Sequence, residues 1–182
     1  MLRDLFARKP KSPTILITLI GVMSAVVCVA TFLIQIPNPA TMGYINVGDA
    51  MVFTSALLFG PTVGFFCGGI GSALADLIGG YSLFAPITFV VKGVEGALVG
   101  LISNGKDWRR DVIAVIIGGV EMISGYFLAE TFILGFGALA ALTEVPGNFF
   151  QILTGCLISV PLSLVVRRYL TTTPLSAEKM EP

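Results

Sequence analysis

The sequence predicts an all-α integral membrane protein, a bundle of six transmembrane helices with both termini in the cytoplasm. Of its 182 residues, 55% are hydrophobic and 12% are charged, and the mean hydropathy is +0.91. Soluble domains carry about 25% charged residues, so this composition leaves too much apolar surface for a soluble core. The apolar residues also fall in runs long enough to cross a bilayer. We therefore expect a single membrane domain over residues 1–182.

The apolar runs define six expected helices. They cover residues of about 14–36, 46–60, 61–80, 83–103, 112–134 and 146–169. The first run is uncharged, longer than the apolar part of a signal peptide and without a small-residue cleavage site, so it is expected to span the membrane. Pro37 and Pro39 should end it, and Gly60-Pro61 marks a turn between the second and third helices. Residues 37–47 are expected to form a loop, and residues 135–146 a softer segment with room for one helical turn.

The basic residues test the helix count, because lysine and arginine gather on the cytoplasmic side of short loops. They precede the first helix, follow the fourth and follow the sixth: Arg3, Arg8, Lys9, Lys11, Lys106, Arg109, Arg110, Arg167, Arg168 and Lys179. The remaining one, Lys92, lies inside the fourth helix, and the other three loops have none. Six crossings place all three basic regions on one side, whereas five or seven would not.

Several function classes are excluded or disfavoured by composition. The formal net charge is zero, so nothing favours a nucleic-acid partner, and there is no histidine, the commonest general base and metal ligand. Cys28, Cys67 and Cys156 all lie in apolar runs, which does not suggest a disulfide framework. No phosphate-binding loop with its lysine is present. We expect no catalytic residue, metal or cofactor, and any energised work requires a partner or an ion gradient.

Charged residues inside apolar helices are costly and need a partner, a wet cavity or a ligand. Asp49 and Asp76 fall near the outer ends of the second and third helices, where capping or interface solvation competes with a functional role. Lys92 and Glu95 lie one turn apart in the fourth helix. The pattern leaves open whether they form a structural ion pair or contact a ligand.

Polar residues in the outer half of the last three helices predict a pocket that opens outward. Glu130 and Tyr126 are four apart on the fifth helix and share a face, while Glu121 lies nearer the inner half. Asn148 and Gln151 are three apart at the start of the sixth helix. The candidate binding residues are Tyr44, Asn46, Lys92, Tyr126, Glu130, Asn148 and Gln151, the first two being on the loop expected to cover the pocket.

Small residues mark two helices. The third helix has glycines at four-residue spacing, which favours close intramolecular packing. The first has Gly21-x-x-x-Ala25 overlapped by Ser24-x-x-x-Cys28. This stripe is either a docking face for another membrane protein or an internal packing surface, and spacing alone does not decide which face docks.

Several motifs resemble those of one transporter family. They are the G-D-A opening of the second helix, the L-F-G-P turn, the glycine-rich G-G-I-G-S-A-L-A-D-L-I-G-G-Y stretch, A-P-I-T-F-V-V-K-G-V-E-G and P-G-N-F-F-Q. Together they resemble the substrate-binding S components of energy-coupling factor (ECF) vitamin transporters, in the group for riboflavin, hydroxymethylpyrimidine and related precursors. The resemblance covers about residues 15–168.

The resemblance implies a plasma-membrane protein that captures a small water-soluble vitamin, such as riboflavin, hydroxymethylpyrimidine or pyridoxine, from outside. It implies docking on a transmembrane coupling subunit driven by two ATPase subunits, with Gly21 and Ala25 on the expected contact. The sequence does not identify the vitamin, or whether the coupling module is dedicated or shared.

Two other function classes remain. A stand-alone proton-coupled secondary transporter is the main alternative, with Asp76, Glu95 or Glu121 as a proton relay. No inverted repeat is apparent to support it. A membrane enzyme or channel is less well supported, since no nucleophile motif or ring of charges is apparent.

Overall fold

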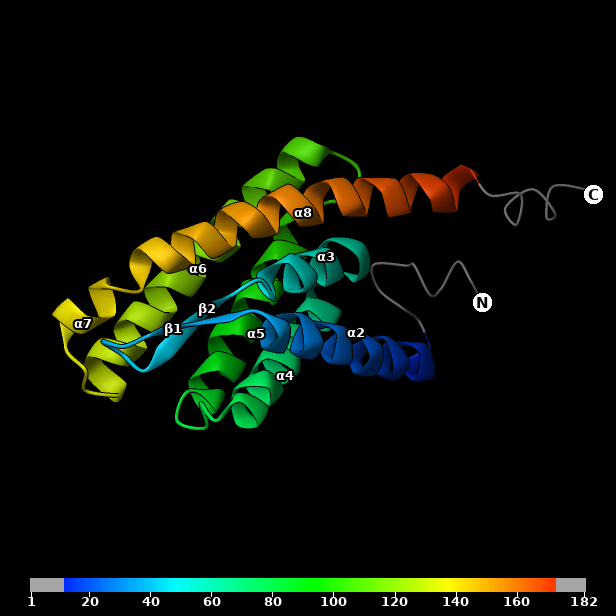
Figure 1. Ribbon diagram of the computed structural model, residues 1–182. Helices are drawn as coiled ribbons and strands as arrows, with labels where there is room; N and C mark the ends of the chain where they lie inside the picture. Colours follow the sequence, from blue (N-terminus) through cyan, green and yellow to red (C-terminus); the bar gives the residue numbers. More distant parts are fainter. Residues whose placement is uncertain (1–11, 173–182) are drawn as a thin grey trace, which may run out of the picture.

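The computed structural model describes residues 12–172 of the chain. Its elements in chain order are α2 (Pro13–Leu33), β1 (Gln35–Asn38), β2 (Gly43–Asn46), α3 (Asp49–Phe59), α4 (Pro61–Gly79), α5 (Ala85–Ile102), α6 (Trp108–Leu128), the π-helix η1 (Ala129–Ile133), α7 (Ala138–Leu142) and α8 (Val145–Thr172). Figure 1 shows a helical bundle with one hairpin lying along it, its turn near α7. Five basic residues used in the charge argument (Arg3, Arg8, Lys9, Lys11 and Lys179) lie outside the described residues.

Five helical segments of the described chain are long and apolar enough to cross a membrane. They are Pro13–Leu33, Pro61–Gly79, Ala85–Ile102, Trp108–Ile133 and Ala138–Tyr169. The shorter apolar helix α3 has 11 residues and is roughly 16 Å long at 1.5 Å per residue, against a hydrocarbon core of about 30 Å. The expected mostly helical membrane architecture is confirmed, while the sixth crossing and the cytoplasmic termini stay predictions.

The expected loop at residues 37–47 is instead a β-hairpin, so the all-α expectation is wrong there. β1 and β2 are antiparallel, with Ile36 opposite Ile45 and Pro37 opposite Tyr44. A residue before proline favours extended backbone, and proline is tolerated in an edge strand because its missing N–H faces away from the partner. Consequently α2 ends at Leu33 rather than near residue 36, and α3 starts at Asp49 rather than near residue 46.

The second half of the chain also differs in its boundaries. α6 begins at Trp108, not near residue 112, because the side chain of Asp107 caps it by accepting a hydrogen bond from the Arg109 N–H at 3.0 Å. The expected single helix over residues 112–134 ends in the π-helix η1, and the soft segment 135–146 contains the single-turn helix α7.

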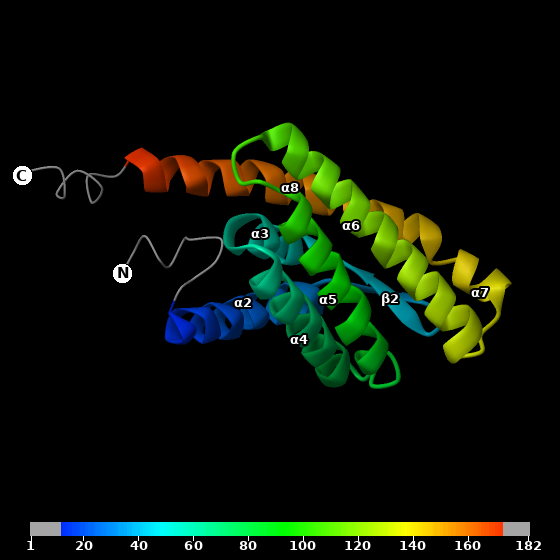
Figure 2. The ribbon, with the colours of Figure 1, turned by 180° about the vertical axis from the view of Figure 1, so that it is seen from behind.

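The glycines of α4 allow this helix to pack closely against α5. A Cβ at Gly64 would lie 2.5 Å from the carbonyl oxygen of Gly96, and one at Gly68 equally close to that of Lys92. Figure 2 shows α4 and α5 running side by side. Gly71 packs in the same way against Ser24 and Val27 of α2. The expected intramolecular packing of these small residues is therefore confirmed.

A buried polar cluster joins four helices near the start of α6. Asp111 accepts hydrogen bonds from the Ser103 hydroxyl and from Arg167, both at 2.5 Å, and Arg167 also donates to the carbonyl of Leu57 at 2.6 Å.

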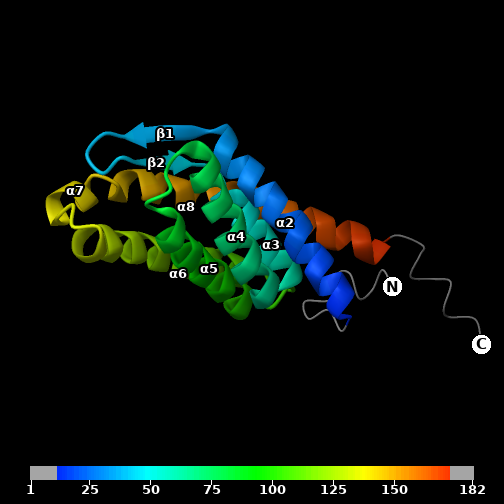
Figure 3. The same ribbon diagram turned by 90° about the horizontal axis from the view of Figure 1, so that it is seen from below.

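The hairpin tip and α7 lie toward the opposite end of the bundle from the start of α2 and the end of α8 (Figures 1 and 3). The basic residues of the described chain other than Lys92 lie at the end of the bundle away from the hairpin, so the two ends differ in charge.

Candidate functional site

A polar cavity lies beneath the hairpin. All seven candidate binding residues line it: Tyr44, Asn46, Lys92, Tyr126, Glu130, Asn148 and Gln151. The lining also includes residues that were not assigned to the site from the sequence: Thr31, Gly43, Ser72, Asp76, Phe84, Thr88 and Glu144. About 30 Å³ of the cavity is open to water, which is room for roughly two or three water molecules. The hairpin and its neighbours therefore close over the site.

Lys92 is the centre of a buried ion cluster at the cavity wall. Its ammonium group pairs with the carboxylate of Asp49 and, at 3.1 Å, with that of Glu95. All three residues are at most 2% exposed. The capping role considered for Asp49 is wrong, because a charge buried this deeply is held by its counter-ion. Lys92 both pairs with Glu95 and lines the cavity, with its ammonium 5.8 Å from the ring centroid of Tyr126.

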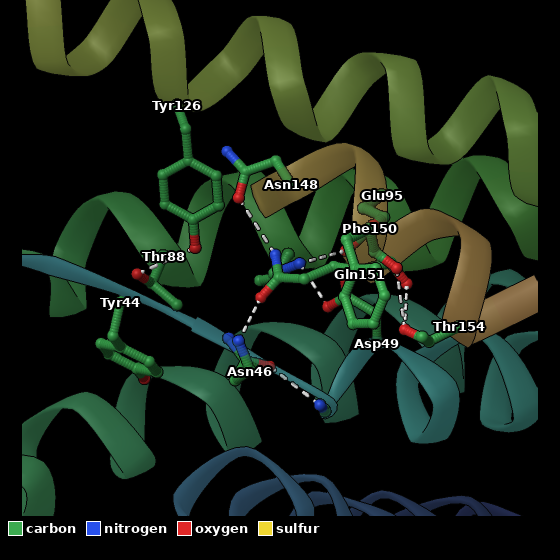
Figure 4. Close-up of polar contacts among 12 residues, drawn as sticks. Tyr44, Asn46, Asp49, Thr88, Glu95, Tyr126, Asn148, Phe150, Gln151 and Thr154 are labelled. Carbon is green, nitrogen blue, oxygen red and sulfur yellow. Dashed lines mark hydrogen bonds and ion pairs between the residues drawn. The ribbon is translucent and has the colours of Figure 1, made fainter. Parts of the chain in front are cut away.

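The amides of α8 hold the second strand of the hairpin in place. Gln151 donates from Nε2 to Asn148 Oδ1 at 3.1 Å, and its Oε1 accepts the backbone N–H of Asn46 at 2.5 Å. Figure 4 shows this chain of contacts, with Tyr126 reaching the same space from α6. Two amides three apart on one helix face were predicted from spacing, but the hydrogen bond between Gln151 and the strand was not.

Two tyrosines add hydroxyl groups to the cavity. The Tyr44 hydroxyl donates to the buried carboxylate of Asp76, and its ring stacks on Tyr81 with centroids 4.4 Å apart. Burial first, and then the Asp76 charge, raise the pKa of Tyr44, so its hydroxyl remains a donor. The Tyr126 hydroxyl donates to Thr88 at 3.1 Å. Asp76 is thus a cavity residue, and the interface role considered for it is wrong.

Glu130 and Glu144 form a carboxyl pair at the cavity. Glu130 is 1% exposed on the π-helix η1, and its carboxyl group faces that of Glu144. Apart from Glu144, neither Glu130 oxygen has a hydrogen-bond partner among the described residues. Glu144 accepts the hydroxyl of Thr41 from the hairpin turn. Glu144 was not predicted from the sequence, although it is the one acid in the otherwise neutral segment 135–146 and that signal could have identified it.

The small-residue stripe of α2 divides between two faces. Ser24 is buried and faces Gly71 of α4. Gly21 and Ala25 are exposed, and no atom lies within 4 Å of the position of a Cβ at Gly21. Internal packing therefore uses the Ser24 face, and the Gly21 face is left open.

A family model and several known proteins match this chain. A family model described as the S component of ECF-type riboflavin transporters matches residues 11–168. The chain is 41% identical over 143 residues to an uncharacterised protein of Pyrococcus woesei, covering 78% of this chain and 95% of that one. It is 27% identical to the thiamine precursor transporter HmpT of Lactococcus lactis, covering 84% and 87% of the two chains.

A solved structure shares the fold. It is the S component of a bacterial ECF transporter, which matches with a TM-score of 0.59 and 20% identity over 88% of this chain and 98% of that one. At this identity the likeness concerns the backbone arrangement alone.

Proposed function

Since the chain belongs to the family of ECF-type riboflavin transporter S components, we propose that it is the substrate-binding subunit of an ATP-driven importer for a vitamin or vitamin precursor. It is a multi-pass membrane protein, and we place it in the plasma membrane with the hairpin outside. A transmembrane coupling subunit and two ATPase subunits supply the energy. It binds and releases its ligand without chemistry of its own. The observation that carries the proposal is the polar cavity beneath the hairpin, because all seven predicted ligand contacts line it.

The hairpin serves as the lid of this cavity. Four side-chain hydrogen bonds hold it to the bundle: Tyr44 to Asp76, Asn46 to Gln151, Thr41 to Glu144 and Asn38 to Thr143. Because the space beneath holds only a few waters, a vitamin enters after these bonds break. A neutral hydrogen bond contributes about 1 kcal/mol net, and one to an ionised carboxylate about 1.5–3 kcal/mol. Opening the hairpin therefore costs on the order of several kcal/mol, which ligand binding has to offset.

Ligand binding tests the proposal directly. The purified protein is expected to bind a water-soluble vitamin or precursor, identified by mass spectrometry of small molecules that co-purify. Asn148→Ala is expected to weaken binding about tenfold, measured by calorimetry, because it removes an amide from the cavity. The control is Ser124→Ala, since Ser124 is exposed, does not line the cavity and donates to the carbonyl of Val120 in its own helix. Unchanged affinity in Asn148→Ala, or no vitamin bound at all, would contradict the proposal.

Uptake assays separate the importer from a proton-coupled secondary transporter. Cells that produce this chain with the coupling subunit and ATPases are expected to accumulate the vitamin, and cells that lack the ATPases are not. Uptake that persists without ATPases and collapses with the proton gradient would favour the secondary transporter.

A further inference from the structure

The cavity has a surplus of acidic groups. Three carboxyl groups line it, those of Asp76, Glu130 and Glu144, against the single ammonium group of Lys92. Behind Lys92 lie two more carboxyl groups, Asp49 and Glu95. Among the described residues that form this region, there are therefore five acidic side chains and one basic side chain.

The one basic group is not available to a negatively charged ligand. Lys92 already bonds Asp49 and Glu95, so the cluster carries no surplus positive charge. An anionic ligand would sit among unpaired carboxyl groups in a low-dielectric space, where like charges repel strongly. A phosphate ester or a carboxylate is consequently disfavoured.

Buried carboxylate oxygens without a donor favour a ligand that supplies N–H groups. Apart from the facing carboxyl group of Glu144, both oxygens of Glu130 are buried without a hydrogen-bond partner among the described protein groups. A buried acceptor left without a donor costs more free energy than a typical hydrogen bond contributes. A ligand that brings N–H donors offsets this cost, and a positively charged donor offsets most of it.

We propose that the ligand is a small single-ring heterocycle bearing an amino or amidine group, and that Glu130, supported by Glu144, binds this group. This inference rests on the proposed function, and it names the substrate class of the same site. The narrow cavity favours one ring over a fused three-ring system, since less of the lining has to move. The Thr41 hydroxyl of the hairpin turn donates to Glu144, so the carboxyl pair that binds the amino group also holds the hairpin closed.

Calorimetry on the unmodified protein is the first test. The probes are hydroxymethylpyrimidine in the form with an exocyclic amino group, its analogue with hydrogen in place of that group, its phosphate ester, and riboflavin. The amino form is expected to bind at least tenfold more tightly than each of the other three. Equal or tighter binding of the deaminated analogue, the phosphate ester or riboflavin would overturn the inference while leaving the importer proposal in place. If none of the four binds and no other vitamin does, the importer proposal itself fails.

The second test removes the proposed acceptor. Glu130→Gln keeps the size of the side chain and is expected to weaken binding of the amino form about 10- to 100-fold, with little change for the deaminated analogue. Glu121→Gln is the matched control, because Glu121 lies on α6 outside the cavity lining and its loss should leave the affinity unchanged. The ratio of the two affinities in each variant corrects for any partial loss of folded protein. An unchanged ratio in Glu130→Gln would overturn the inference.

Discussion

Lys92 illustrates how single residues in this protein are understood only through their neighbours. Its spacing from Glu95 shows that one turn of helix separates them, and this predicts a pair. Asp49, its second partner, is 43 residues away and comes from the start of α3. Without a fold, nothing brings that carboxylate to the ammonium group. The resulting cluster keeps three charged side chains within an apolar bundle.

Lys92→Met is expected to lower the free energy of unfolding by about 3–5 kcal/mol, because it leaves Asp49 and Glu95 buried without a counter-ion. Denaturant unfolding in detergent micelles measures this. The triple variant Lys92→Met, Asp49→Asn, Glu95→Gln should recover most of the loss, since no charge is then left unpaired. Stability of Lys92→Met equal to that of the unmodified protein would show that the cluster is not the stabilising unit.

At the scale of elements, the α4–α5 contact and the contacts of the hairpin have different sequence origins. The α4–α5 contact follows from glycines at four-residue spacing, a pattern that is visible in the sequence. The hairpin is held by hydrogen bonds to α4, to Thr143 just after α7 and to α8, all far away in the chain. Its strands are four residues each, too short to give a clear alternation of apolar and polar residues, which is why a loop was expected.

Gly96→Ala tests the helix contact. The added methyl group would collide with the backbone of Gly64, so we expect a loss of about 1–3 kcal/mol in stability. Gly21→Ala is the control, because its methyl group meets no atom within 4 Å and the change should be neutral or slightly stabilising. Thermal unfolding of the two variants side by side gives the comparison, and equal midpoints would contradict the packing argument.

Tyr44→Phe tests the hairpin as a lid. Removing the hydroxyl breaks the bond to Asp76 while the ring still stacks on Tyr81. We expect ligand to dissociate about tenfold faster, measured by stopped-flow displacement. Tyr81→Phe keeps the same ring stack and should leave the rate unchanged. A dissociation rate in Tyr44→Phe like that of the unmodified protein would mean that this bond does not hold the lid.

At the scale of the whole molecule, the described helices expose many large apolar side chains, as a lipid-facing bundle requires. Residues such as Ile17, Val22 and Leu33 of α2 are more than half exposed. On this helix the small residues Gly21 and Ala25 break the otherwise bulky surface and allow close approach by another helix. The cavity and this open face are separate surfaces, which allows binding and docking to be tested separately.

Ala25→Leu is expected to leave ligand affinity unchanged and to reduce co-purification of the coupling subunit and ATPases several-fold. A larger side chain would hold the partner helix away from α2. Val22→Leu is the control, since it changes a bulky exposed position of the same helix. Equal recovery of the partner subunits with Ala25→Leu and with the control would remove this face from the docking surface.

The sequence by itself determined the membrane class, the run of long apolar helices, the glycine contact of α4 and seven residues that share one cavity. These follow from local composition, spacing and the cost of polar groups in lipid, all of which are properties of short segments. Only the tertiary structure decided that residues 35–46 form a hairpin, that Asp49 pairs with Lys92, and that Asp76 and Glu144 belong to the cavity. Those contacts join segments tens of residues apart, and their free energy depends on a burial that does not exist until the helices have packed.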